Sequence, residues 1–332
     1  MADIINEIKN IKIDKKDKKI IRELNWNART TNSRLAKKIQ LSKKGVEYRI
    51  KRLENSGVIE GYYPFINFMK LGYKYCRVFL KLQYLNDSIK KEMEKFIIPN
   101  KDYNWSLWAA GEYDLVIGGW CKTLGEFKKR ISKFVVKFDK NIKFTKFSFG
   151  IELNQFPYDF LSEEQHKQKL VMKEDLESIK ADKTDFLILK ELTTNARVPF
   201  LDISRKLNLS PMTIKKRIEK LQKNEILLGC HASINEEIIG YTHFKLLLFL
   251  SKKNEKEIKK IEDFLSSKKN VIYFVDEIGI CDLDFEMLSS STADFLSLIK
   301  DLQENFSDSI KDYEYFIFTK TIKINFMPKD IG

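Results

Sequence analysis

The sequence has few of the residues that bind metals or form covalent cross-links. Its 332 residues include four cysteines and three histidines. The cysteines (Cys76, Cys121, Cys230 and Cys281) show no CxxC spacing, and the histidines do not cluster. These absences argue against a structural zinc site and a disulfide framework, and they are typical of a protein from a reducing compartment. We therefore predict no metal and no other cofactor.

Long hydrophobic segments are absent as well. The start, Met1 to Ile4, has an early acidic residue and no cationic-then-apolar run, so no signal peptide is predicted. The longest apolar stretch, Leu246 to Leu250, is far too short to cross a bilayer. The sequence therefore predicts a soluble, cytoplasmic protein.

Acidic residues are scarce in the first half of the chain only. Residues 1–165 hold 33 Lys and Arg against 20 Asp and Glu, a net charge of +13, whereas residues 166–332 hold 27 of each. An excess of positive charge attracts phosphate backbones and anionic surfaces. Lysine that merely covers solvated faces is the alternative explanation.

What the sequence does contain is an internal repeat. Sliding the chain by 168 positions aligns it with itself without a gap for about a hundred residues, with 16 identities in the 48 positions from Asp14 to Gly61. The repeated Asn-Ala-Arg at residues 27–29 and 195–197 is one of the matches. The period is too long for a solenoid unit, so we interpret it as a duplicated pair of domains.

Each copy begins with a pattern typical of a winged helix-turn-helix. Apolar residues recur at three- and four-residue steps through three segments, which predicts three short helices. Thr31 to Ser33 and Ser42 are suited to cap the second and third helices, and Gly57 to end the third in a left-handed conformation. Residues 58–63 then read as a strand and turn, which forms the wing.

The second part of each copy alternates strand and helix patterns in the order βαββαβ, which is typical of a ferredoxin-like sandwich. The elements expected in the first copy are residues 77–83, 89–96, 105–110, 115–120, 124–138 and 142–151, and those in the second are 244–250, 258–265, 271–277, 283–287, 292–306 and 310–318. The predicted fold class is α+β, with two winged helix-turn-helix domains alternating with two such sandwiches. The predicted domains are 13–65, 66–158, 181–233 and 234–328, with 159–180 as a linker.

The third helix of a helix-turn-helix enters the major groove of DNA with basic and polar residues facing bases and phosphates. The apolar residues within the segment 43–55 face the core. The opposite side of this helix therefore carries the candidate DNA-binding residues Lys43, Lys44, Gly45, Tyr48, Arg49 and Arg52. The matching face of the second copy carries Met212, Thr213, Lys216, Arg217 and Lys220. Arg49, Arg52 and Lys44 are expected to hold phosphates or read purine edges, and Arg217, Lys216 and Lys220 to do so more weakly. A protein-docking role is the alternative for such small domains, but two basic units on one chain favour double-stranded DNA.

These motifs resemble those of the Lrp/AsnC transcriptional regulators. The resemblance rests on Leu41-Ser42-x-x-x-Val46-x-x-Arg49-Ile50-x-x-Leu53-Glu54-x-x-Gly57-Val58-Ile59, on Leu71-Gly72-Tyr73 and on Gly111-Glu112-Tyr113-Asp114. The second copy shows the same pattern more weakly. The resemblance implies a DNA-binding domain followed by a ferredoxin-like domain that pairs with another copy and senses amino acids or related metabolites.

The second copy departs from the pattern where its third helix ends. Glu225 replaces Gly57, and it is a poor residue for a left-handed position, whereas Asn224 beside it tolerates that conformation. We therefore expect a shifted wing and different DNA contact in the second copy.

The turn of Gly111, Glu112, Tyr113 and Asp114 matches the effector loop of the family. Glycine exposes backbone N–H groups to a ligand carboxylate, and Asp114 is placed to accept from an α-ammonium. Gly279 and Asp282 form the equivalent turn. The alternative is an ordinary strand turn closed by a side-chain-to-backbone hydrogen bond.

Charge also distinguishes the two sandwich domains. Residues 66–150 hold 17 basic and 8 acidic residues, a net charge of +9, whereas residues 234–332 hold 13 and 18, a net charge of −5. Opposite charges favour pairing of the two copies with each other, so we expect an intramolecular pseudo-dimer, with further homo-oligomerisation left open. Random drift of surface charge is the alternative.

The sequence thus predicts a DNA-binding regulator that is not an enzyme. An enzyme resembling siroheme decarboxylase is one alternative, but the second strand of each sandwich lacks the His and Arg expected for that chemistry. An architectural DNA-binding protein without effector is the other. The operator, the ligand and the direction of regulation do not follow from the sequence.

Overall fold

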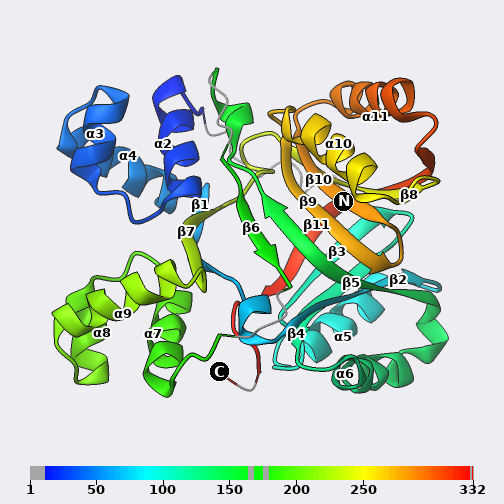
Figure 1. The fold of residues 1–332 in the computed structure, drawn as a ribbon, viewed down its shortest axis with the longest axis horizontal. Coiled ribbons are helices and arrows are strands. Elements are labelled where there is room, and N and C mark those ends of the chain that lie inside the picture. The colour runs from blue at the N-terminus through cyan, green and yellow to red at the C-terminus, as the bar shows by residue number, and fades with distance from the viewer. Residues whose placement is uncertain (1–11, 164–167, 175–178, 330, 332) are drawn as a thin grey trace.

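The computed structural model describes residues 12–163, 168–174, 179–329 and 331. The two helix-turn-helix units lie at one end of the molecule and the β-rich body lies at the other (Figure 1). In the described part of the chain, no helix has the length and apolar character needed to cross a membrane.

Each helix-turn-helix unit is built from three helices and one strand, at matching positions in the two copies. The first comprises α2 (Lys15–Trp26), α3 (Asn32–Ile39), α4 (Lys43–Asn55) and β1 (Ile59–Ile66), and the second α7 (Lys183–Thr194), α8 (Phe200–Leu207), α9 (Pro211–Lys223) and β7 (Leu227–Ile234). Thr31 and Ser42 are the N-caps of α3 and α4, as the sequence predicts. Gly57 has a φ of +76°, which confirms its left-handed conformation.

The expectation of a shifted wing in the second copy is wrong. Glu225 itself takes the left-handed conformation with a φ of +53°, while Asn224 stays at −84°. The strand that follows begins at Leu227, at the same point of the repeat as Ile59 in the first copy. The cost of a left-handed non-glycine residue is only about 1–2 kcal/mol. Burial of Ile226 and Leu227 in the core directly after it keeps the register in place.

The wing strands pair with each other instead of forming separate wings. β1 and β7 make a two-stranded antiparallel sheet in which Tyr63 lies opposite His231. These two residues are equivalent in the repeat, so the pseudo-two-fold axis that relates the two copies passes through this pair.

Both sandwiches have the predicted βαββαβ order. The first comprises β2 (Lys74–Leu82), α5 (Asp87–Ile97), β3 (Trp105–Gly111), β4 (Leu115–Cys121), α6 (Leu124–Lys137) and β5 (Ile142–Gln155), with short 3-10 helices at Met69–Leu71 and Asp139–Asn141. The second comprises β8 (Thr242–Leu250), α10 (Glu255–Ser266), β9 (Val271–Gly279), β10 (Leu283–Ser289), α11 (Thr292–Phe306) and β11 (Ile310–Ile324). The strand orders β5-β2-β4-β3 and β11-β8-β10-β9 are equivalent.

The two four-stranded sheets join edge to edge at both ends. β3 pairs with β11, and β5 pairs with β9, so the eight strands close on themselves. Each junction hides two sheet edges whose backbone groups would otherwise be open to other chains. The segment expected to be a linker contains a 3-10 helix, Asp159–Leu161, and the strand β6 (Leu170–Lys173), which extends the sheet along β5.

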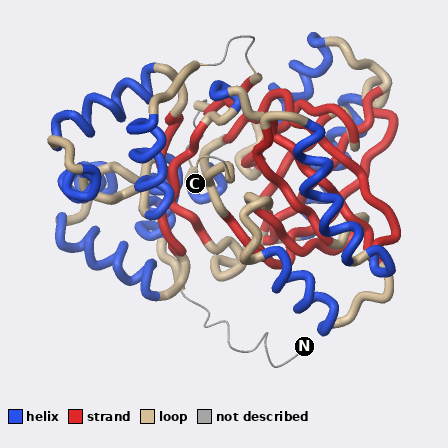
Figure 2. The backbone as a smooth tube through the Cα atoms, turned by 90° about the horizontal axis from the view of Figure 1, so that it is seen from below, coloured by secondary structure: helices blue, strands red, loops and turns tan. Residues whose placement is uncertain are grey.

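Alternate residues of these strands pack on opposite sides of the closed sheet. One side packs against α5 and α6 in the first copy and against α10 and α11 in the second. The other side faces inward, where residues such as Phe79, Leu107, Leu247 and Phe316 from both copies form a shared core. The tube view shows the strands gathered in one body with helices around it (Figure 2).

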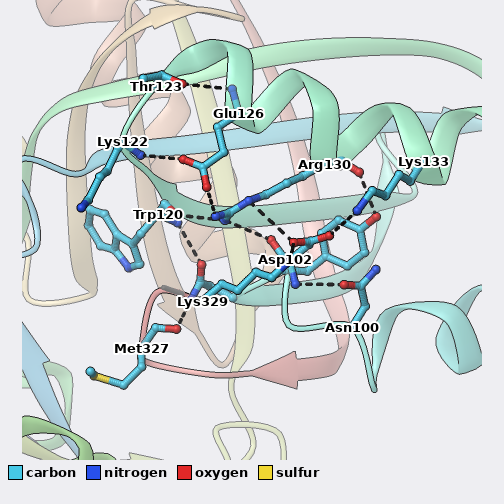
Figure 3. Close-up of polar contacts among 12 residues, drawn as sticks. Asn100, Asp102, Trp120, Lys122, Thr123, Glu126, Arg130, Lys133, Met327 and Lys329 are labelled. Carbon is cyan, nitrogen blue, oxygen red and sulfur yellow. Dashed lines mark hydrogen bonds and ion pairs between the residues drawn. The ribbon is translucent and has the colours of Figure 1, made fainter. Parts of the chain in front are cut away.

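The C-terminal segment of the second copy is fastened to the first. After β11, the Asn104 side chain donates to the carbonyls of Asn325 and Met327, at 3.2 and 2.6 Å. The buried carboxylate of Asp102 binds Lys133 of α6 and Lys329 of this segment, at 2.9 and 2.6 Å (Figure 3). The two copies are therefore held together by side chains as well as by strands.

Candidate nucleic-acid interface

The candidate DNA-binding residues lie where the sequence places them, on α4 and α9. Lys43, Lys44 and Tyr48 are exposed, and the ring of Tyr48 is 70% accessible. In the described ranges, the side chains of Lys43 and Lys44 make no hydrogen bond or ion pair with another residue. Gly45 is half-buried behind the capping hydroxyl of Ser42, which accepts from its N–H at 3.0 Å. The start of α4 therefore presents two free ammonium groups beside a helix N-terminus, where anions bind favourably.

The second copy presents a different set of exposed groups. Met212 is 58% accessible, and Lys216 and Lys220 are exposed, whereas Thr213 is half-buried near Ser210. A shallow hollow of about 310 Å³ lies beside α9. It is lined by Asp182, Thr213, Lys216, Arg217 and Lys220. The two helices therefore differ in shape and chemistry at the face that would meet DNA.

Arg49 and Arg217 are not the free phosphate-binding groups that the sequence predicts, because each is bound to two carboxylates. Arg49 Nη1 lies 2.7 Å from Asp14 and 2.8 Å from Asp17, at the capping box that begins α2. Arg217 repeats this contact with Asp182 and Asp185 at 2.7 and 2.8 Å. Each arginine thus ties its recognition helix to the N-terminus of the first helix of the unit. We call these contacts the Arg49 and Arg217 clamps.

The clamps shift the pKa values of Arg49 and Asp182. The hydrogen bonds that Arg49 donates to Asp14 and then to Asp17 raise its pKa above the ordinary value. The hydrogen bond from Arg217 lowers the pKa of Asp182, with a further contribution from the N–H of Asp185. At neutral pH Arg49 is therefore protonated and Asp182 is ionised, and the stability that the Arg217–Asp182 pair contributes is lost as acid protonates Asp182.

The first clamp has a second arginine. Arg52 also binds the fully buried carboxylate of Asp17, whereas its counterpart Lys220 lies 3.9 Å from Asp185. A buried carboxylate that receives two guanidinium groups is better compensated than one that receives a guanidinium and a distant ammonium.

The repeated Asn-Ala-Arg motif joins the two units. The N–H of Ala28 donates to the carbonyl of Cys230 on β7, and the N–H of Ala196 donates to the carbonyl of Tyr62 on β1. Arg29 Nη1 donates to the carbonyl of Ala196 at 2.6 Å, and its guanidinium lies over the Phe200 ring. Through these contacts across the pseudo-two-fold axis, the two recognition helices keep a fixed relation.

The turns expected to bind an effector are engaged in the fold. The Asp114 carboxylate accepts from the N–H of Leu82 at 2.8 Å, and Asp282 accepts from Leu250 at 2.7 Å. These side-chain-to-backbone bonds join each turn to a neighbouring strand of its own sandwich, β2 in the first copy and β8 in the second. Tyr113 is buried and donates to Glu314 of the other copy at 2.6 Å, whereas Glu112 is exposed.

The glycines of both turns lie close to the other copy. A Cβ at Gly111 would meet the backbone of Tyr315 and Phe316 within 3.1 Å, and one at Gly279 would lie 2.3 Å from the carbonyl oxygen of Phe147. Both glycines also have φ above +120°. Gly111 and Gly279 are thus required for the β3–β11 and β5–β9 junctions, whatever else they bind.

Sequence reasoning missed the clamps, although both were visible as a pattern. Asp14, Asp17 and Arg49 recur as Asp182, Asp185 and Arg217 in the repeat. An acid pair and an arginine retained together in both copies are consistent with contact between them.

We predict that Asp17→Asn lowers the free energy of unfolding by about 3 kcal/mol, because it leaves two arginines beside a neutral amide. The matched variant Asp185→Asn should cost less, since its carboxylate binds one arginine closely. Urea denaturation followed by circular dichroism measures both. Equal losses, or none, would contradict the clamp assignment.

Comparisons with known proteins identify the two winged helix-turn-helix segments and the fold. A family model described as winged helix-turn-helix DNA-binding matches residues 13–60 and 182–227. The regulatory protein AsnC of Haemophilus influenzae is 36% identical over 86 residues, which are 25% of this chain and 57% of that protein. The chain thus spans little more than half the length of that relative.

An uncharacterised HTH-type transcriptional regulator of Pyrococcus furiosus is 31% identical over 107 residues, which are 32% of this chain and 71% of that protein. The crystal structure of the siroheme decarboxylase NirDL shares the fold over 95% of this chain and 94% of that chain, with a TM-score of 0.61 at 12% identity. The matches to two winged helix-turn-helix segments and to these regulators show that the chain belongs to the Lrp/AsnC family, as a tandem duplication.

Proposed function

We propose that this protein is a sequence-specific, double-stranded-DNA-binding transcriptional regulator whose two helix-turn-helix units act together as an intramolecular pseudo-dimer. The observation that supports it best is the pair of exposed cationic faces on α4 and α9. The β1–β7 sheet and the Asn-Ala-Arg contacts relate these faces by a pseudo-two-fold axis. Dimeric regulators present two recognition helices to two half-sites in this way.

Within this proposal, Lys43 and Lys44 bind phosphates in the first copy and Lys216 and Lys220 in the second. These ammonium groups are exposed, whereas the guanidinium groups of Arg49 and Arg217 are occupied by the clamps. Tyr48 and Met212 occupy exposed positions on the two faces and would make unlike contacts with base edges. The proposal therefore assigns phosphate contacts to lysine and orientation of the helices to arginine.

For an effector, the proposal follows the family in taking an amino acid or related small metabolite. The Asp114 and Asp282 carboxylates already accept backbone N–H groups, so the contact with the turn falls to a ligand carboxylate at the exposed backbone of Gly111 and Gly279. Those glycines abut the junctions between the copies, so binding there would act on the pairing of the two sandwiches.

A siroheme-decarboxylase-like activity is the alternative, favoured by the shared fold over nearly the whole chain. At 12% identity this likeness concerns the fold alone. The strands β3 and β9 contain neither His nor Arg, which the sequence interpretation expected such an enzyme to carry there. A tetrapyrrole absorbance band in the purified protein, or on titration with siroheme, would favour this alternative.

We predict that the double variant Lys43→Ala with Lys44→Ala weakens DNA binding and reduces its dependence on salt. Each lost phosphate contact removes about 0.9 from the slope of log affinity against log salt concentration. Fluorescence anisotropy at a series of salt concentrations gives this slope.

The matched control is Lys128→Ala with Lys129→Ala, which removes the same charge from exposed positions on α6. If the α6 lysines are a solvated face, this control keeps the parental slope. Equal reductions in the two variants would mean that net charge, and not the α4 contact, sets the affinity.

We also predict that selection from a random DNA pool yields two dissimilar half-sites about 34 Å apart or a multiple of that distance. The two recognition faces differ, so an asymmetric operator should outcompete a perfect palindrome. Discrete footprints would support a regulator. A continuous footprint without sequence preference would support an architectural protein instead.

A further inference from the structure

A cluster of charged side chains lies inside the closed sheet, on the face where the two copies meet. Arg77 of β2 is almost completely buried and binds Glu277 of β9 and Asp284 of β10. Its distance to Asp284 is 2.7 Å. Arg77 also donates to the hydroxyl of Ser148 at 2.9 Å. The arginine belongs to the first copy and both carboxylates belong to the second.

The second copy adds its own cation to the cluster. Lys245 is buried and lies 2.6 Å from Asp284 and 2.9 Å from Glu286. Burial alone would raise the pKa of Glu286, but Lys245 holds it below its ordinary value, with a further contribution from His243. We define the pairing cluster as Arg77, Lys245, Glu277, Asp284 and Glu286.

The repeat shows that the pairing cluster is not symmetric. Lys245 is the equivalent of Arg77, so each copy supplies one cation at the same position. The three carboxylates have no such counterparts. Their equivalents in the first copy are Ala109, Val116 and Gly118.

This asymmetry makes the charge balance depend on which copies pair. Both junctions follow one pseudo-symmetric register, in which Gly111 lies opposite Phe316 and Gly279 lies opposite Ser148. Two first copies paired in this way would bury two arginines with none of the three carboxylates. Two second copies would bury six carboxylates with two lysines. The unlike pair buries three carboxylates with two cations, beside His243 at 3.0 Å from Glu286.

We propose that the pairing cluster selects the partner of each sandwich, so that the inner face of the first copy accepts a second-copy face and rejects another first copy. An uncompensated buried charge disfavours like pairing, because removing an ion from water without an opposite charge is costly. The partner that fits the first-copy face is therefore a sheet with carboxylates at the positions of Glu277 and Asp284. This selection keeps two unlike recognition helices together in every assembled unit.

The experiment cuts the chain between the two copies, so that like pairs and unlike pairs can both form. A protease site inserted between Glu174 and Ile179 leaves the contacts of both residues with the first copy in place. The folded chain is cut, unfolded in urea and refolded, and native mass spectrometry counts the pairs. We expect unlike pairs to exceed a statistical mixture by at least about tenfold, which corresponds to about 1.4 kcal/mol.

Two neutralised chains serve as matched tests of the cluster. One carries R77M, E277Q and D284N, which nearly conserve volume. The other carries R77L, E277A and D284V, which place the first-copy residues at the two acidic positions. Both chains retain the Lys245–Glu286 pair. After cutting and refolding, we expect the fragments of both chains to form like and unlike pairs in nearly statistical proportions.

Single substitution gives a second readout that does not require refolding of fragments. In the uncut chain, R77M should lower the melting temperature, because Glu277 loses its cation and Asp284 keeps only Lys245. Adding E277Q and D284N should restore much of the loss. Statistical pairing by the parental fragments, or unchanged selectivity in both neutralised chains, would overturn the proposal. So would an R77M chain as stable as the parent. None of these measurements involves DNA, so the outcome is independent of the proposed regulatory function.

Discussion

The backbone pairing of β3 with β11 and of β5 with β9 is the constraint on which the rest of the structure depends. A four-stranded ferredoxin-like sheet leaves two edges with unpaired N–H and C=O groups. In this chain each copy satisfies the edges of the other, and the eight strands close. Closure buries the inner faces of both sheets against each other, and it fixes the positions from which β1 and β7 lead to the helix-turn-helix units.

Duplication within one chain relaxes the requirement that both halves be identical. A symmetric dimer must use each surface residue twice, whereas this chain has changed the two copies independently. Some structural contacts have stayed alike: the Arg49 and Arg217 clamps and the Ala28 and Ala196 hydrogen bonds occur in both copies. The faces proposed to bind DNA have diverged, as Tyr48 against Lys216 and Lys44 against Met212 show.

The sequence predicted most of the fold because the relevant signals are local. Ser42 caps α4 through a hydroxyl that accepts from the N–H three residues later, and such a bond depends on neighbouring residues alone. The failure at Glu225 has the opposite cause. Its own preference disfavours a left-handed conformation, but the buried Ile226 and Leu227 impose it through packing that the local sequence does not reveal.

The sequence by itself determined the duplication, the element order, the caps and the candidate recognition faces, because periodicity and the 168-residue repeat are properties of the chain alone. Tertiary structure decided which charges are free. Arg49 and Lys44 have similar surroundings in the sequence, yet one is bound to Asp14 and Asp17 and the other is exposed. It also placed Arg77 against Glu277, two hundred residues away. Contacts between distant segments depend on how the sheets close, and no local pattern in the chain predicts which distant residues will meet.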